Sequence, residues 1–439
     1  MIRALLATAA LALAVPALAK PIAVDGGKIE GVALPSGVNA WLGVPFAAPP
    51  LRELRWQPPR QVKPWTGTYH ADRTAPQCLQ PLRSPRQNHY FGNEASSEDC
   101  LYLNVWAPRS AKKLPVVVWV YGGGFNIGSA SMANYSGEPL AKAGVVRVNI
   151  AYRVGALGFL AHPELSRESG YGASGNYGLM DQIAALQWVQ RNIAKFGGDP
   201  ANVTIAGQSA GSMSVALLQM SPQAKGLFHR VVGMSGSPFG GMLGPVNDAA
   251  ALAAAVRARF PTNGDAVLAA YGATDPARAA ADIARDSTVG LQMAGWAASQ
   301  QAHGKAAAYV YLFTRRQPYA PGITFNDHDP ATVGAYHTGD VPYWLRTRDA
   351  LNLFRTTRVW EPSDVALEAE MSAALLSFAR GGVPVSPGLG QWPAFAPANP
   401  RLAMLGESSA LVSWPHFADL ALFMGQGEMP RPAGAKPRD

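Results

Sequence analysis

The segment VTIAGQSAGS, residues 203–212, limits the possible folds of this chain more than any other stretch. Three β-branched residues at its start predict a strand, and the apolar spacing over about 210–220 predicts a helix. Ser209 lies at the turn between them, flanked by Gly207 and Gly211. A serine in such a G-x-S-x-G turn is held above the edge of a sheet with its hydroxyl exposed. The segment therefore predicts an α/β fold with a reactive serine.

Strands and helices are predicted to alternate around this segment. The predicted elements are a hairpin at 22–34, strands at 101–108, 114–123, 144–153, 229–237 and 306–313, and helices at 176–198, 248–260, 276–304 and 365–381. Such alternation favours a mostly parallel central sheet with helices on both faces. We find no internal repeat and no linker, so we expect one domain over 20–429, followed by a disordered tail at 430–439.

The first 19 residues have the features of a secretory signal peptide. Arg3 precedes an apolar run over 4–15, and the sequence ALA at 17–19 is a typical cleavage pattern. The run is interrupted by Pro16 and is short for a membrane span, and no later stretch is longer. We expect cleavage after Ala19, a secreted or periplasmic location and no stable membrane insertion.

The formal net charge of +8 raises the question of an anionic partner. Nucleic-acid-binding proteins gather their basic residues into patches or runs. Here the basic residues are scattered along the chain. We therefore expect a basic exported protein with no nucleic-acid partner.

The chain contains two cysteines, Cys78 and Cys100. In an oxidising compartment an even pair favours one disulfide, although two free buried thiols are the alternative. A disulfide closing a loop of this length stabilises a protein by roughly 3 kcal/mol through the entropy of the unfolded chain.

The sequence YGGGF at 121–125 ends the strand predicted at 114–123. Consecutive glycines allow backbone N–H groups to turn toward a ligand, as the oxyanion of an acyl-transfer reaction requires. Gly123, Gly124 and Ala210 are the predicted donors. The alternatives are a flexible turn or a phosphate loop, but a phosphate loop needs a lysine that is absent here.

His337 is the candidate general base. It lies in the loop segment GAYHTGDVPYWL at 334–345, 128 residues after Ser209. In hydrolases with this serine turn, the order along the chain is nucleophile, acid, histidine. The other histidines show no metal-type clustering, and a solvated loop is expected for His328, which lies between Asp327 and Asp329.

Taken together, these motifs resemble the type B carboxylesterases of the α/β-hydrolase fold, which are relatives of the cholinesterases. The resemblance extends over about 22–245 and 248–415. It is carried by EDCLYLNVWAP, YGGGF, GNYGLMDQIAALQWVQRNIAKFGGDP, FGGDPANVTIAGQSAG, MSGSP and AYHTGDVPYW, which follow one another in that order.

The resemblance implies a two-step reaction. Ser209 would attack the carbonyl of a small-molecule ester, and water would hydrolyse the acyl-enzyme. His337 would act as general base and then as acid for the leaving alcohol. Gly123, Gly124 and Ala210 would form the oxyanion hole. The resemblance also implies a disulfide between Cys78 and Cys100, and it requires no metal or organic cofactor.

The sequence departs from the family pattern at two positions beside these motifs. The family has Glu where this chain has Gln208, and Asn where this chain has Ala151. We expect both changes to affect the support of the serine turn and to leave the reacting atoms untouched.

The acid of the triad is missing from its expected place, and its identity is unknown from the sequence. The family acid is a glutamate, and no glutamate lies between Ser209 and His337. The interval contains seven aspartates: Asp248, Asp265, Asp275, Asp282, Asp286, Asp327 and Asp329. We expect Asp286 to begin a helix, and Asp248 is the best substitute because it follows the predicted strand at 229–237 by a short loop.

The same interval is short, because 67 residues separate Pro238 from Ala306, and their pattern is mostly helical. The sequence therefore predicts that one sheet strand, together with the acid after it, is missing.

Two functions remain open. One is a serine esterase of weak activity, and the other is an impaired or inactive scaffold with a binding role, since a fold does not guarantee activity.

Overall fold

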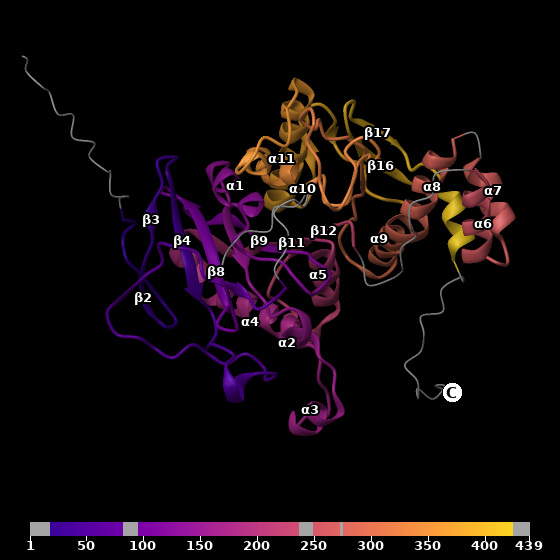
Figure 1. The fold of residues 1–439 in the computed structure, drawn as a ribbon. Coiled ribbons are helices and arrows are strands. Elements are labelled where there is room, and N and C mark those ends of the chain that lie inside the picture. Colours follow the sequence, from indigo (N-terminus) through magenta and orange to yellow (C-terminus); the bar gives the residue numbers. More distant parts are fainter. Residues whose placement is uncertain (1–17, 82–94, 237–248, 273–274, 425–439) are drawn as a thin grey trace, which may run out of the picture.

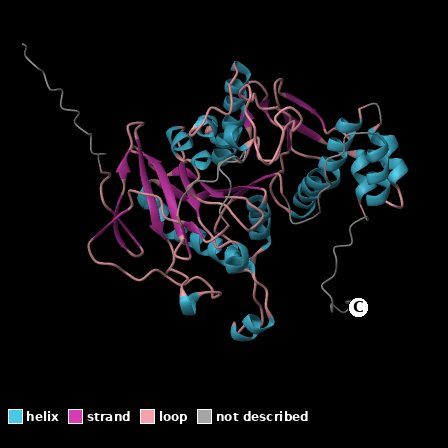
Figure 2. Ribbon diagram, in the orientation of Figure 1, coloured by secondary structure: helices cyan, strands magenta, loops and turns pink. Residues whose placement is uncertain are grey.

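The computed structural model describes residues 18–81, 95–236, 249–272 and 275–424 (Figure 1). Most of the predicted signal peptide, the tail at 430–439 and the candidate acid Asp248 lie outside the described residues. Where it is described, the chain forms a large sheet covered by helices (Figure 2).

Seven strands form the central sheet, in the order β12-β11-β9-β10-β8-β4-β3. Their bounds are β3 Val32–Ala33, β4 Val38–Pro45, β8 Tyr102–Pro108, β9 Leu114–Val120, β10 Val146–Ile150, β11 Gly198–Gln208 and β12 Arg230–Met234. The strands β10, β9, β11 and β12 pair in parallel, whereas β10, β8, β4 and β3 pair antiparallel. Every residue of β10 is buried, as expected for a strand covered on both faces.

Helices cover both faces of this sheet (Figure 1). The helices α1 (Glu138–Lys142), α10 (Val341–Leu345) and α11 (Pro362–Gly381) lie on one side, and α4 (Tyr177–Asn192) and α5 (Ala210–Met220) lie on the other. The short helices α2 (Gly155–Phe159) and α3 (Pro163–Glu168) follow β10. The predicted α/β class, with helices on both faces, is confirmed.

The sheet ends at β12. In the chain that follows, residues 249–272 and 275–310 contain no strand. They form α6 (Ala249–Arg259), α7 (Gly264–Tyr271), α8 (Pro276–Arg285), a π-helical turn (Asp286–Gly290) and α9 (Leu291–His303). The next strands, β13 (Tyr311–Phe313), β16 (Arg401–Leu405) and β17 (Ala410–Ser413), form a separate sheet. This separation agrees with the predicted loss of a sheet strand.

The remaining strands form small sheets at the periphery. These are β1 (Ile22–Val24) with β2 (Gly27–Glu30) and β5 (Thr68–His70), β6 (Gln77–Cys78) with β7 (Ser96–Ser97), and β14 (Val385–Ser386) with β15 (Gly390–Gln391). The first pair is the hairpin predicted at 22–34.

The predicted disulfide is confirmed. Cys78 at the end of β6 and Cys100 before β8 are bonded, with their Cα atoms 4.9 Å apart. Both residues are buried. The bond therefore fastens the loop that follows β6 to the start of a central strand.

Two features are absent from the described residues. None of the helices there is both long and apolar enough to cross a bilayer. No group of three or more histidine, cysteine or acidic side chains in this part of the chain is arranged to hold a metal ion.

Candidate active site

Ser209 occupies the sharp turn between β11 and α5. Its backbone has φ 56° and ψ −124°, a region that residues other than glycine rarely adopt. Its N–H donates to the Met234 carbonyl at 2.8 Å, so the neighbouring strand β12 holds the turn in place. The residue is partly exposed. The predicted strand–turn–helix is therefore present with the strain typical of a nucleophile elbow.

The two glycines around Ser209 are required by close backbone contacts. A Cβ atom on Gly207 would lie 2.3 Å from the Gly211 carbonyl oxygen, and one on Gly211 would lie 2.1 Å from the Val120 oxygen. Only glycine fits at such distances. The spacing of the motif thus allows α5 to start directly against the end of β9.

The glycine-rich turn after β9 lies against this elbow. A Cβ atom on Gly122 would be 2.9 Å from the Ser209 Cβ. Gly123 and Gly124 have φ values of 124° and 62°, and neither donates its N–H to a backbone carbonyl in the described turns. Ala210 is the first residue of α5, where an N–H lacks a helical acceptor. The three predicted oxyanion donors therefore come from two segments that meet at Ser209.

His337 is carried by the loop between β13 and α10. Gln317 fixes this loop, because its amide donates to the Gly339 carbonyl at 2.8 Å and accepts from the Tyr336 hydroxyl at 2.8 Å. The ring of His337 lies beside the elbow, with its Nε2 3.0 Å from the Gln208 Nε2. Solvent reaches His337, yet the protein that surrounds the ring lowers its pKa by disfavouring the charged form.

Gln208 corrects one expectation from the sequence. The change from the family glutamate was expected to leave the reacting atoms untouched, but the Gln208 amide contacts the candidate base directly. Gln208 is 1% exposed and is the last residue of β11. Ser209 itself has no hydrogen bond to His337 among the described residues, and the ring Nε2 is paired with Gln208.

No carboxylate pairs with His337 among the described residues. Asp340 follows three residues later, but it is buried, accepts from the Tyr311 hydroxyl at 2.7 Å and has its pKa raised by burial. Asp286, expected to begin a helix, is the first residue of the π-helical turn that follows α8. It is fully buried and pairs with Arg285 at 2.6 Å.

The other described aspartates of the interval have partners elsewhere. Asp265 pairs with Arg257, Asp282 with Arg278 and Arg285, and Asp327 with His328, while Asp275 and Asp329 accept from backbone N–H groups. The structure therefore supplies no triad acid from these positions.

His328 is not in a solvated loop, contrary to expectation. Its side chain is 11% exposed and lies between the rings of Phe325 and Tyr336, with centroids 4.7 and 5.6 Å away. It also hydrogen-bonds the Tyr319 hydroxyl at 2.9 Å. Packing among aromatic side chains of the long loop between β13 and α10 explains this burial.

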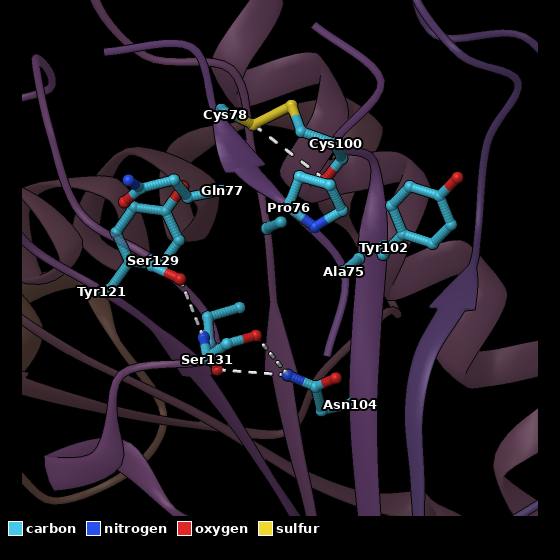
Figure 3. A pocket seen from close by; sticks show the side chains of 12 residues that line it. Ala75, Pro76, Gln77, Cys78, Cys100, Tyr102, Asn104, Tyr121, Ser129 and Ser131 are labelled. Atoms are coloured by element: carbon cyan, nitrogen blue, oxygen red, sulfur yellow. Dashed lines mark hydrogen bonds between the residues drawn. A yellow bond between two sulfur atoms is a disulfide. The ribbon is translucent and has the colours of Figure 1, made fainter. Parts of the chain in front are cut away.

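Two hollows lie near the disulfide, and neither is lined by Ser209 or His337. The first has an empty volume of about 260 Å³, partly open to solvent, and is lined by Cys78, Cys100, Tyr102, Asn104 and Ser131 among others (Figure 3). The second, of about 240 Å³, is also lined by Cys78 and Cys100, together with Arg55 and Glu98. The candidate site at the end of β11 belongs to neither hollow.

The model of the Carboxylesterase family matches residues 19–271 and 270–414. A fumonisin B1 esterase from Sphingopyxis macrogoltabida is 50% identical over 210 residues, which are 47% of this chain and 38% of that protein. An acetylcholinesterase from Bungarus fasciatus is 42% identical over 227 residues, which are 49% of this chain and 37% of that protein.

A solved structure of a PNB esterase shares the fold. It has a TM-score of 0.73 at 24% identity and covers 92% of this chain and 99% of that chain. This likeness confirms the predicted α/β-hydrolase fold. In contrast, the segments matched to the fumonisin B1 esterase and the acetylcholinesterase span less than two fifths of the length of those proteins.

Proposed function

The chain belongs to the carboxylesterase family, and from this membership we propose that it hydrolyses small-molecule carboxylic esters through an acyl-enzyme on Ser209. The names of its relatives refer to esters as different as fumonisin B1 and acetylcholine. The proposal is therefore made for the ester bond and not for one substrate. The strained backbone of Ser209 beside the glycine-rich turn is the observation that carries it.

The proposed chemistry uses the groups that meet at the elbow. The Ser209 Oγ attacks the ester carbonyl and its proton passes to His337 Nε2. The oxyanion that forms accepts from the N–H groups of Gly123, Gly124 and Ala210. Collapse of this intermediate breaks the ester C–O bond, and the leaving alkoxide takes the proton from His337. Water then repeats the sequence on the acyl-enzyme and releases the acid.

The contacts of His337 favour a second function. His337 lacks a carboxylate partner among the described residues, and its Nε2 pairs with Gln208. An orienting acid keeps the histidine of a triad in its reactive state. The alternative proposal is therefore a catalytically impaired or inactive scaffold that binds a ligand without turning it over.

Substitution of Ser209 separates the two proposals. For Ser209→Ala we expect loss of both the burst and the steady-state release of nitrophenol from a short-chain p-nitrophenyl ester, because no acyl-enzyme can form. Ser221→Ala, at the end of the same helix α5, is the matched control and should behave as wild type. Equal turnover by Ser209→Ala and wild type would contradict the esterase proposal and leave the scaffold proposal standing.

We propose that the protein is exported after cleavage behind Ala19. The apolar run before Ala19 and the disulfide between Cys78 and Cys100 support this proposal, because disulfides persist in oxidising compartments. We expect N-terminal sequencing of the exported protein to begin at Lys20. A sequence that begins at Met1 would contradict it.

A further inference from the structure

The Gln208 side chain is placed to control the candidate base. It is the last residue of β11, it is 1% exposed, and its amide nitrogen lies 3.0 Å from His337 Nε2. A Cβ atom on Gly122 would lie 3.1 Å from the Gln208 Oε1, so the glycine-rich turn confines the other end of the amide. The amide is thus held between the oxyanion segment and the imidazole.

The chemistry of these two groups fixes the location of the ring proton. An amide nitrogen donates hydrogen bonds and has no lone pair to accept one, so His337 Nε2 must be the acceptor. A neutral imidazole that accepts at Nε2 carries its proton on Nδ1. The nitrogen that would take the proton of Ser209 is therefore already occupied, since it has one lone pair.

We propose that Gln208 is a positioning residue that competes with Ser209 for His337 Nε2, so that the base becomes available only when the amide moves away. This proposal rests on the proposed function, because it assigns to Gln208 the regulation of the same reaction. The contact with Gln208 also accounts for a neutral ring with its proton on Nδ1. No carboxylate among the described residues accepts a hydrogen bond from that nitrogen.

No charged group offsets this arrangement. Among the described residues, no charged side chain contributes to the lowered pKa of His337. The nearest acid along the loop, Asp340, faces Tyr311. A carboxylate at position 208 would therefore be the first charge to act on the ring, and it would favour the imidazolium form.

Three variants test the proposal. Gln208→Leu removes the amide, and Gln208→Glu replaces it with a carboxylate. Gln182→Leu is the matched control, because Gln182 is also fully buried but its amide donates to Ser214 Oγ at 3.0 Å. The readouts are the ¹⁵N chemical shifts of His337, assigned with His337→Gln and followed against pH, and the rate constant of the nitrophenol burst.

In the wild type we expect the ¹⁵N shifts of neutral His337 to show the proton on Nδ1. Gln208→Leu should move the Nε2 shift and raise the burst rate constant about fivefold, which corresponds to one hydrogen bond of ordinary net strength. Gln208→Glu should raise the pKa of His337 and lower the burst rate at pH 7, because the carboxylate favours the imidazolium form. Gln182→Leu should change neither readout.

The opposite results would overturn the proposal. A wild-type ring protonated on Nε2, or Nε2 shifts that are the same in Gln208→Leu and wild type, would show that the amide does not hold this nitrogen. A burst rate constant that stays unchanged or falls in Gln208→Leu would show that the amide does not compete with Ser209 for His337. If Ser209→Ala shows that there is no esterase activity, the ¹⁵N shifts still test the contact itself.

Discussion

Ester turnover by this protein is expected to be about 10⁴-fold slower than that of an enzyme with a complete triad, which is the usual effect of losing the orienting acid. The reason is structural, because the described residues provide no carboxylate for His337 and the nearest acid, Asp340, is bonded to Tyr311. The residual rate would come from the oxyanion N–H groups and from ester binding.

Substitution of the aspartates tests this expectation. Asparagine at each of the six described positions between Ser209 and His337 should change the turnover number by less than threefold, because each carboxylate has another partner. Variants of Asp286 require a parallel measurement of stability, since that side chain is fully buried against Arg285. A thousandfold fall of turnover in a stable variant would show that this aspartate is the acid. Asp248→Asn applies the same test to the position outside the described residues.

Substitution of His337 tests independently whether an orienting carboxylate is missing. Members of a triad act as a unit, so removing the histidine costs far less once the acid is gone. We expect His337→Ala to lower turnover by about 10²-fold, against about 10⁶-fold for a complete triad. A loss near 10⁶-fold would mean that His337 is fully oriented and that the expectation of a slow enzyme is wrong.

The second large effect concerns stability, and it comes from a buried arginine near the start of β10. Arg147 is fully buried, and none of its three guanidinium nitrogens has a hydrogen-bond partner in the part of the chain that the structure describes. Its guanidinium carbon lies 5.2 Å from the centre of the Trp119 ring, a cation–π contact that offsets a small part of the cost. We expect Arg147→Met to stabilise the protein by about 1–4 kcal/mol.

Arg153 provides the matched control. It is also buried, but it forms two hydrogen bonds with the carboxylate of Asp181 in α4, at 2.7 and 2.8 Å. The same substitution there, Arg153→Met, leaves a fully buried carboxylate without its partner. We expect it to destabilise the protein by about 3–5 kcal/mol. Two identical changes six residues apart should therefore have effects of opposite sign.

The pH dependence of the Arg147 effect follows from its protonation. Burial lowers the pKa of Arg147 to about 9, below its ordinary value in the unfolded chain. Below pH 9 Arg147 is charged in both the folded and the unfolded protein, so the cost of burying its charge does not vary with pH. Above pH 9 the folded state loses its proton first, so the wild type is stabilised as pH rises. The advantage of Arg147→Met should thus be full at pH 7 and should decline above pH 9.

Urea unfolding midpoints at equal m-values provide the measurement for both arginine variants. A destabilised Arg147→Met protein would mean that the guanidinium has favourable partners, and it would contradict the interpretation of Arg147 as an unpaired charge. Similar losses of stability in Arg147→Met and Arg153→Met would contradict the same interpretation.

Family membership and the local parts of the site could be read from the sequence, and the type B carboxylesterase resemblance is confirmed. The elbow around Ser209 was predictable because its strand, turn and helix lie within one continuous segment. The glycines at 207 and 211 were informative because backbone approaches at that turn exclude any side chain. The absence of a strand in the described part of the interval between β12 and β13 was predictable because this interval lacks a β-branched apolar run. The extent of β13 was not, since pairing with β16 begins only at Tyr311.

The sequence by itself thus determined the fold class, the elbow, the disulfide pair and the absence of a glutamate before His337, all of which depend on local pattern or on residue type. Only the tertiary structure decided that Gln208 contacts His337 and that Asp286 is buried against Arg285. It also decided that the Arg147 guanidinium lacks a hydrogen-bond partner among the described residues, whereas that of Arg153 pairs with Asp181. The physical reason is that Gln208 and His337 are 129 positions apart. Whether two such groups meet depends on how separate elements pack, and a one-dimensional pattern does not contain that information.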